Sequence, residues 1–163
     1  MAAVPMPDYR WSGKALPSAF RQLQHEKCWV VWRYTWNGKK WDKPPLNPRT
    51  GRNASSTGAA TWGTFSEAIA GLRRFGCHGI GLVIRKDDNL TAIDLDGCIS
   101  ESGTYSDPAA RVIEAAETYC EISPSGLGVR ALTYSSAPFA LLDSLILPSA
   151  SARTPRPDGE ISQ

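Results

Sequence analysis

Cysteine and histidine are scarce in this sequence of 163 residues, which has four cysteines and two histidines. No two cysteines form a Cys-x-x-Cys pair, and no histidine stands at zinc-finger spacing from them. The pattern argues against a zinc site and against a small disulfide-bonded scaffold, so we expect reduced thiols. His25 and His78 are isolated from each other and from any acidic pair, and neither is assigned a role.

Long apolar segments are also missing. Residues 1–11 contain no apolar signal-peptide core, and the least charged stretch, residues 131–152, is interrupted by serine, proline and Asp143. No internal repeat with the period of a solenoid or propeller is present. These absences predict a cytoplasmic protein that makes no contact with a membrane.

The overall composition is that of a globular protein, and the charged residues are unevenly distributed along the chain. Hydrophobic residues make up 42% of the chain and charged residues 21%, which predicts a packed core. The formal net charge is +2, but the chain up to Arg85 holds 13 basic and 4 acidic residues, and the remainder holds 5 basic and 12 acidic residues. This polarity suits a site that binds a polyanion and a divalent cation together, and scattered surface charge is the competing interpretation.

Turn and helix signals divide the first half of the chain. Asn37-Gly38 between two Trp-rich runs predicts a β-hairpin, and Thr64 with Glu67 matches the capping box that starts a helix. The segment from Lys43 to Pro48 is too rich in proline for a helix or a central strand. The expected elements are a helix over 18–25, a hairpin over 28–41, a loop over 43–60 and a helix over 65–75.

Turn and helix signals also divide the second half of the chain. The polar residues 85–89 separate two apolar runs and predict a second hairpin, and Asp107 before a proline predicts a helix N-cap. The glycines of the turn 124–128 permit a tight reversal. The expected elements are a hairpin over 80–95, a helix over 107–119, strands over 121–123 and 129–134, and at most a short apolar element over 139–147.

This order, ββ-α-ββ-α-ββ, predicts an α+β fold. We place one compact domain at residues 27–135, after an N-terminal arm and short helix over 1–26. Residues 136–163 are rich in Ser, Ala and Pro, and we expect an irregular or disordered tail there.

Asp94 and Asp96 are the first candidate site residues. Side chains two apart in a strand lie on the same face, with Ile93 and Leu95 on the opposite face. Two neighbouring carboxylates repel each other unless a cation or water screens them, and Mg²⁺ and Mn²⁺ prefer such hard oxygen ligands. The pattern predicts a metal site, and two solvated aspartates or a turn that begins at Asp94 are the alternatives.

The segment from Ser123 to Arg130 joins two expected strands through a turn of small residues. Its hydroxyls, backbone N–H groups and the Arg130 guanidinium suit phosphate oxygens, although a plain hairpin turn fits the pattern equally well. Together, an acidic strand and a phosphate-binding turn form the minimum of a metal-dependent nucleotidyl transfer site.

Several short segments follow one another along the chain, and their joint order is more specific than any one of them. They are Trp29-Val30-Val31-Trp32, Lys43-Pro44-Pro45, Ala54-Ser55-Ser56-Thr57 before Thr61-Trp62, Gly79-Ile80-Gly81-Leu82-Val83, Ile93-Asp94-Leu95-Asp96-Gly97-Cys98 and Ser123-Pro124-Ser125-Gly126-Leu127-Gly128. In this order the chain resembles the primase-polymerase branch of the archaeo-eukaryotic primase superfamily, specifically the N-terminal catalytic domain of phage and plasmid replication proteins.

The resemblance implies an RRM-like, mostly antiparallel sheet with flanking helices and an N-terminal α/β unit. It also implies DNA primase and polymerase activity in replication, with Mg²⁺ or Mn²⁺ as cofactor and with nucleoside triphosphates, a single-stranded DNA template and a replicative helicase as partners. Asp94 and Asp96 match the metal-binding catalytic acids. The residues that match or extend the triphosphate contacts are Ser123, Ser125, Gly126 and Arg130, and Lys43 is a further phosphate contact or else a solvated lysine.

Two departures from the family pattern matter. The second motif commonly ends in histidine, where this chain has Arg130, which binds phosphate but does not transfer a proton. The third acidic motif has only Asp143 as a nearby candidate, in a segment that does not resemble a core strand. An inactive, truncated nucleotide- or single-strand-binding module and a small phage interaction protein are therefore the alternative functions.

Two interpretations fit five tryptophans in the first half of the chain. Core and hairpin packing is the favoured interpretation, and a stacking surface for single-stranded nucleic acid is the alternative. The residues concerned are Trp29, Trp32, Trp36, Trp41 and Trp62.

Overall fold

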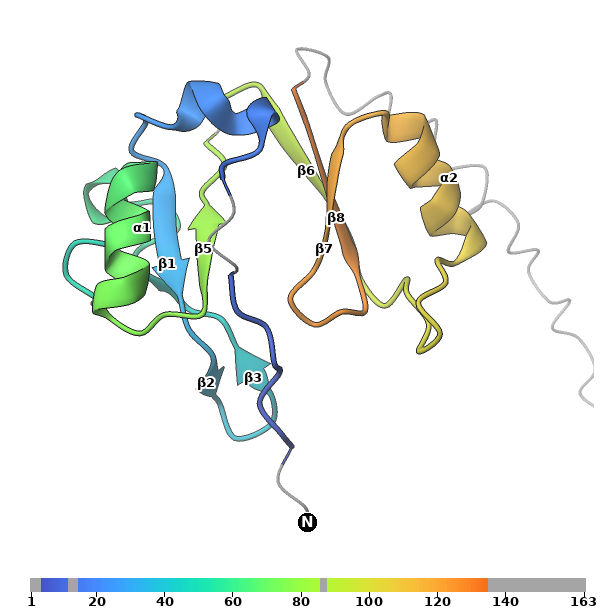
Figure 1. Cartoon of the computed structure of the whole chain (residues 1–163), viewed down its shortest axis with the longest axis horizontal. Coiled ribbons are helices and arrows are strands. Elements are labelled where there is room, and N and C mark those ends of the chain that lie inside the picture. Colours follow the sequence, from blue (N-terminus) through green and yellow to red (C-terminus); the bar gives the residue numbers. More distant parts are fainter. Residues whose placement is uncertain (1–3, 12–14, 86–87, 135–163) are drawn as a thin grey trace, which may run out of the picture. The chain divides into compact units, whose positions relative to one another are not determined.

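The computed structural model of the chain describes residues 4–11, 15–85 and 88–134. The chain divides into two compact units between Asp88 and Asn89. In the described residues each unit combines antiparallel sheet with an α-helix, which confirms the predicted α+β class (Figure 1). The predictions for the tail, including the element over 139–147 and Asp143, lie outside the described residues, and the predicted domain boundaries stay predictions.

The main sheet of the first unit has the strand order β4-β1-β5, and both pairings are antiparallel. The central strand, β1 (Trp29–Trp32), is buried at all four residues, as expected for a strand covered on both faces. The edge strand β4 (Pro45–Leu46) lies inside the range predicted as a loop over 43–60. It begins with a proline, which an edge strand tolerates because not every N–H group of an edge strand has to pair. The other neighbour is β5 (Gly79–Leu82).

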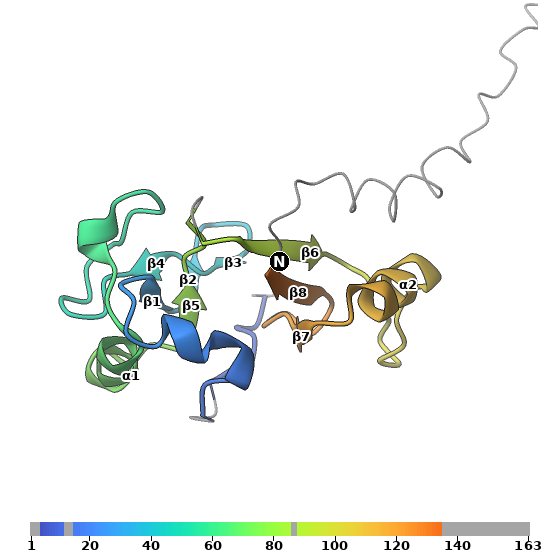
Figure 2. The same cartoon turned by 90° about the horizontal axis from the view of Figure 1, so that it is seen from above.

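Helix α1 (Phe65–Arg74) packs on β1 (Figure 2). The predicted capping box is confirmed, because Thr64 Oγ1 accepts from the Glu67 N–H and Glu67 Oε2 accepts from the Thr64 N–H. Gly71 lets the helix approach the proline segment closely, since a Cβ at this position would lie 2.3 Å from the carbonyl oxygen of Pro48. The helix ends near residue 75, as predicted.

The first predicted hairpin forms, but it is shorter than expected. Strands β2 (Thr35–Trp36) and β3 (Trp41–Asp42) make a separate two-stranded sheet around Asn37-Gly38. The prediction was wrong in including β1, which pairs with β4 and β5 instead. The turn signal is local, whereas the buried Trp-Val-Val-Trp segment gains more from a central position in the larger sheet.

The N-terminal segment contacts this unit at several points. The Trp11 N–H donates to the carbonyl of His78 at 2.8 Å, and the Tyr9 ring stacks on Trp32 with centroids 5.6 Å apart. The predicted helix over 18–25 is a 3-10 helix, η1 (Ser18–Leu23), and a second 3-10 turn, η2 (Ala59–Thr61), lies in the long loop.

The second unit contains a three-stranded antiparallel sheet with the order β6-β8-β7. Its elements are β6 (Leu90–Leu95), α2 (Asp107–Ala116), β7 (Tyr119–Ile122) and β8 (Val129–Tyr134). Its core contains residues of α2, of the sheet and of the loop between β6 and α2, namely Cys98, Ile99, Ala109 and Val129, with Leu95, Ile113 and Cys120 packed against them. The residues that alternate with Leu95 and Val129 therefore lie on the sheet face away from α2.

Three details of the second half differ from the predictions. Helix α2 ends at Ala116 instead of continuing to residue 119, since Glu117 has φ +41° and β7 already begins at Tyr119. Strands β5 and β6 do not form a hairpin, because β5 pairs with β1 and β6 pairs with β8. The N-cap of α2 is Ser106 rather than Asp107, which occupies the first helical position. The errors at the hairpin and at the N-cap arise where a local polar signal fits two neighbouring arrangements equally well.

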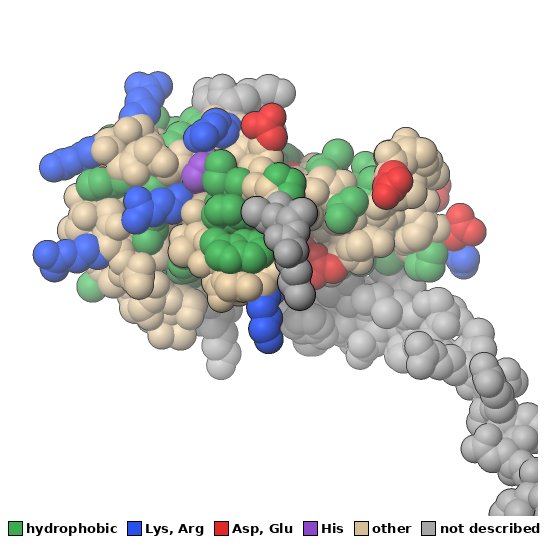
Figure 3. Space-filling view, turned by 90° about the horizontal axis from the view of Figure 1, so that it is seen from below, with side chains coloured by type: hydrophobic (Ala, Val, Ile, Leu, Met, Phe, Trp, Pro, Cys, Tyr) green, Lys and Arg blue, Asp and Glu red, His purple; other side chains and the backbone are tan. Residues whose placement is uncertain are grey.

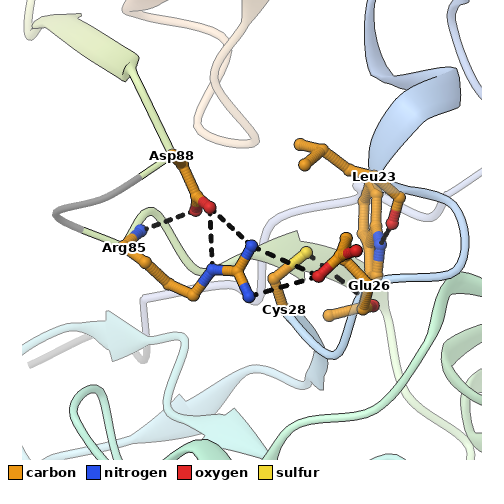
Figure 4. Close-up of polar contacts among 6 residues, drawn as sticks. Leu23, Glu26, Cys28, Arg85 and Asp88 are labelled. Carbon is orange, nitrogen blue, oxygen red and sulfur yellow. Dashed lines mark hydrogen bonds and ion pairs between the residues drawn. The ribbon is translucent and has the colours of Figure 1, made fainter.

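The turn between β5 and β6 is tied to the first unit by Arg85 (Figure 4). The Arg85 backbone N–H and Nε donate to the Asp88 carboxylate at 2.9 and 2.8 Å, and the guanidinium also reaches Glu26 Oε2 at 3.4 Å. The Arg85 side chain holds the pKa of Asp88 below its usual value. Nearby, burial raises the pKa of the Cys28 thiol to about 11.

No helix in the described part of the chain has the length and apolar character to cross a membrane.

Candidate active site

The two candidate acids lie at the end of β6. Asp94 is in the strand, and Asp96 follows directly after it. Both are exposed, whereas Ile93 before Asp94 and Leu95 between the two acids are half-buried, so the predicted alternation is present. In the described part of the chain, no hydrogen bond or ion pair of the Asp96 carboxylate is found.

Arg130 lies directly across from Asp94 in the register of β6 and β8. Its Nη2 donates to Asp94 Oδ2 at 3.2 Å. Side-chain exposure is 38% for Arg130 and 51% for Asp94, so water screens this pair and its contribution to stability is small. The predicted phosphate contact is therefore adjacent to a predicted metal ligand.

Arg130 has a second acidic neighbour that the sequence analysis missed. Glu121 is opposite Arg130 in the register of β7 and β8, and its Oε1 lies 4.0 Å from Arg130 Nη1. Tyr119 donates its hydroxyl to Glu121 Oε2 at 3.0 Å. Counting outward from the turn would have found this row, because Ile122 pairs with Val129 and the next pair is Glu121 with Arg130.

The turn between β7 and β8 has an ordered backbone. The Ser123 N–H donates to the Gly128 carbonyl and the Gly126 N–H donates to the Ser123 carbonyl, both at 2.8 Å. The hydroxyls of Ser123 and Ser125 lie 2.8 Å apart, with Ser123 buried and Ser125 exposed. Gly126 has φ +77°, which favours glycine. The turn is therefore ordered by its own hydrogen bonds, and Ser125 is exposed on it.

Gly128 brings this turn against the end of the acidic strand. A Cβ at Gly128 would lie 2.7 Å from the Leu95 carbonyl oxygen, 3.2 Å from Ser123 Oγ and 3.4 Å from the Cα of Asp96. Only glycine permits so close an approach. The structure therefore brings together the two predicted motifs, the acids of β6 and the serine turn, within the second unit.

Two further candidates are not part of this cluster. Lys43 belongs to the first unit, where it is exposed and its Nζ lies 6.0 Å from the ring centroid of Trp32. Asp143 lies outside the described residues. Among the tryptophans, Trp29, Trp32 and Trp62 are buried, whereas Trp36 is 41% exposed.

The donor set of the site fits a hard divalent cation. Asp94 and Asp96 offer carboxylate oxygens on one exposed face, and Mg²⁺ completes its six-fold coordination with water and phosphate oxygens in many proteins. Within the described ranges, no group of three His, Cys, Asp or Glu side chains is placed to hold a metal ion. The remaining ligands at such a site would have to come from water and from a bound nucleotide.

Comparison with known proteins finds a relative of this chain. The chain is 38% identical over 122 residues to a DNA primase-polymerase of Nitratiruptor phage NrS-1, and the match covers 74% of this chain. The chain spans only 16% of the length of that relative. No family model matches the chain. The similarity supports a relationship of the matched part to primase-polymerases of replication.

Proposed function

We propose that this chain, whose matched part is related to a phage DNA primase-polymerase, carries a metal-dependent site for primer synthesis on single-stranded DNA. The observation that supports this most is the contact at Gly128, which sets the serine turn against the strand end that carries Asp94 and Asp96. Carboxylates that bind a cation and a turn that binds phosphate are the parts that nucleotidyl transfer needs at one place.

In this proposal each residue has a defined task. Asp94 and Asp96 hold Mg²⁺ or Mn²⁺, which when bound supplies positive charge to the transferring phosphoryl group. Arg130 gives up its contact with Asp94 when that carboxylate ligates a cation, and its planar guanidinium then faces the triphosphate. The groups that receive the triphosphate with it are Ser123, Ser125 and Gly126.

The reaction is an in-line displacement. The 3′-hydroxyl of the growing strand attacks the α-phosphorus of the nucleoside triphosphate, and pyrophosphate leaves. Arg130 stays protonated at physiological pH, so it stabilises the phosphates but does not accept the hydroxyl proton, which passes to water. A replicative helicase as a partner belongs to the same proposal, whereas Lys43 lies in the first unit and is not assigned to this site.

A second candidate function is nucleotide binding without turnover. The observation in its favour is that the described residues bring no third carboxylate to Asp94 and Asp96. A two-carboxylate site binds a nucleotide–metal complex, but it fixes fewer of the oxygens that the transfer step requires.

Primer synthesis on single-stranded DNA tests the proposal. Wild-type chain, labelled nucleoside triphosphates and Mn²⁺ or Mg²⁺ should give short labelled products, and Asp94→Ala should abolish them. Glu114→Gln, an exposed acid on α2, is the matched control and should leave the products unchanged. Metal-dependent nucleotide binding without product would favour the second candidate, and absence of both signals would contradict the two.

A further inference from the structure

The β2–β3 hairpin of the first unit presents an exposed aromatic ring among cations. Trp36 is 41% exposed although it is a large apolar residue, and its ring pairs with Trp41 at a centroid distance of 5.4 Å and an angle of 58°. Lys39 and Lys40 occupy the turn, and both are exposed. The hairpin is a two-stranded sheet of its own, so no further strand covers its edges in the described residues.

The turn holds its lysines on an ordered backbone. Asn37 Oδ1 accepts hydrogen bonds from the N–H groups of Lys39 and Lys40, both at 2.9 Å, and the Asn37 N–H donates to the Lys40 carbonyl at 3.1 Å. Gly38 has φ +97°, a conformation that glycine adopts without strain. An ordered turn reduces the entropy lost when the two lysines bind a ligand.

An open hollow lies beside the exposed ring. It is lined by Thr35, Trp36, Asn37, Asp42, Lys43 and Pro44. Its one acid, Asp42, is already engaged, because Asn37 Nδ2 donates to Asp42 Oδ2 at 2.7 Å and Lys40 Nζ lies 3.9 Å from Asp42 Oδ1. The hollow therefore combines an indole, a proline ring and the Lys43 ammonium group, and Lys39 and Lys40 lie on the adjoining turn.

We propose that this hairpin binds single-stranded nucleic acid, with a base stacked on Trp36 and backbone phosphates at Lys39, Lys40 and Lys43. An exposed aromatic ring flanked by cations provides the two interactions that sequence-independent single-strand binding uses, stacking and phosphate contact. A duplex is disfavoured because its bases are already stacked on each other.

The charge of the surrounding unit supports the same ligand. Residues 1–88 hold 14 basic and 6 acidic residues. Lys and Arg side chains extend from the surface of the first unit in Figure 3. This inference deepens the proposed function by giving the template strand a contact, but the binding itself requires neither metal nor nucleotide.

Fluorescence anisotropy with a labelled oligothymidylate, in buffer without metal or nucleotide, tests the inference. Trp36→Ala should weaken binding at least about fivefold, since stacking contributes ~1 kcal/mol or more per base. Trp36→Phe keeps a stacking face and should retain most of the affinity. The double variant Lys39→Ala/Lys40→Ala should lower the slope of log affinity against log salt by ~1.4, because two phosphate contacts are lost.

The matched control is Arg73→Ala/Arg74→Ala, which removes two exposed cations from α1 of the same unit. It should weaken binding less than the lysine pair does. Unchanged affinity of Trp36→Ala, equal affinity for duplex, or no binding by wild type would overturn the inference. Equally tight, Trp36-dependent binding of polyglutamate would assign the hairpin to an acidic protein instead. Failure here would leave the primer-synthesis result unaffected, because the two assays share no component of the proposed active site.

Discussion

Arg130 occupies the position where the proposed metal site and the proposed phosphate site meet. It lies between Asp94 on one neighbouring strand and Glu121 on the other, within 3.2 and 4.0 Å of their carboxylates. All three side chains are substantially exposed, so their ion pairs contribute little to folding. The effect of Arg130 on ligand binding can therefore be measured separately from its effect on stability.

Replacing Arg130 should impair nucleotide binding far more than folding. Arg130→Ala removes charge-assisted hydrogen bonds to phosphate, and we expect roughly tenfold or greater weakening of nucleotide binding, because such bonds contribute about 1.5–3 kcal/mol. Arg130→Lys should give an intermediate affinity, since it keeps the charge but loses the planar fork. Titration calorimetry measures the affinities, and urea unfolding should show a change in stability below about 1 kcal/mol. A large loss of stability with unchanged affinity would contradict these roles.

Gly128 should be intolerant of any side chain. Gly128→Ala places a Cβ 2.7 Å from the backbone oxygen of Leu95, and overpacking of this kind costs ~1–3 kcal/mol. Because the clash separates the serine turn from Asp96, nucleotide binding should fall as well. Gly103→Ala is the control: its Cβ meets open space, so its cost is limited to the strain of its φ of +81° and nucleotide binding should not change. Urea unfolding and calorimetry of both variants test this, and equal nucleotide affinity in the two would refute the role of Gly128.

At the scale of elements, Arg85 makes the polar contacts that hold the two ends of the turn after β5. Arg85 binds Asp88 through its backbone N–H and its guanidinium, and it also contacts Glu26 on the segment before β1. The Asp88 side chain is only 5% exposed, so the contact is shielded from water. These contacts fix the end of the first unit.

The Asp88 contact predicts a dependence of stability on pH. The pKa of Asp88 is lowered in the folded state, so its contribution is complete above the ordinary carboxyl range and is lost as the pH falls below about 4. Asp88→Asn should lower the free energy of unfolding by about 1–3 kcal/mol at pH 7 and by less at pH 3. Glu101→Gln, an exposed acid, is the control. A stability difference between wild type and Asp88→Asn that is the same at both pH values would contradict this account.

Elements with a complete local signal were predictable, and strand partners were not. The capping box at Thr64 and the turn at 124–128 specify their own geometry within a few residues, and both were located correctly. The partner of β5 depends on β1, some fifty residues earlier, and the polar residues between β5 and β6 look like a hairpin turn whichever partner is chosen. Local sequence carries little information about such long-range pairing.

At the scale of the whole molecule, the arrangement of the site was partly readable from the sequence. The period of two in a strand placed Asp94 and Asp96 on one exposed face. Glu121 was missed because its role depends on the register of β7 against β8, and the close approach at Gly128 depends on the β6–β8 pairing. Both relations arise between strands, so neither is visible in a motif.

At the scale of the whole molecule, the proposal concerns a chain much shorter than the phage protein to which it is similar. This chain spans 16% of the phage primase-polymerase that it matches. The described residues supply a candidate metal and triphosphate site in the second unit and a candidate single-strand site in the first. Primer synthesis requires both ligands at once, so the two proposals are complementary although they are tested separately.

The most direct test of the central claim is a calorimetric titration of the chain with an Mn²⁺–nucleoside triphosphate complex, comparing wild type with Asp96→Asn and with the control Glu114→Gln. The account predicts saturable binding to one site in wild type and Glu114→Gln, and at least about tenfold weaker binding in Asp96→Asn, whose neutral amide is a poor ligand for a hard cation. Equal affinity in all three proteins would contradict the assignment of Asp94 and Asp96 as the metal site.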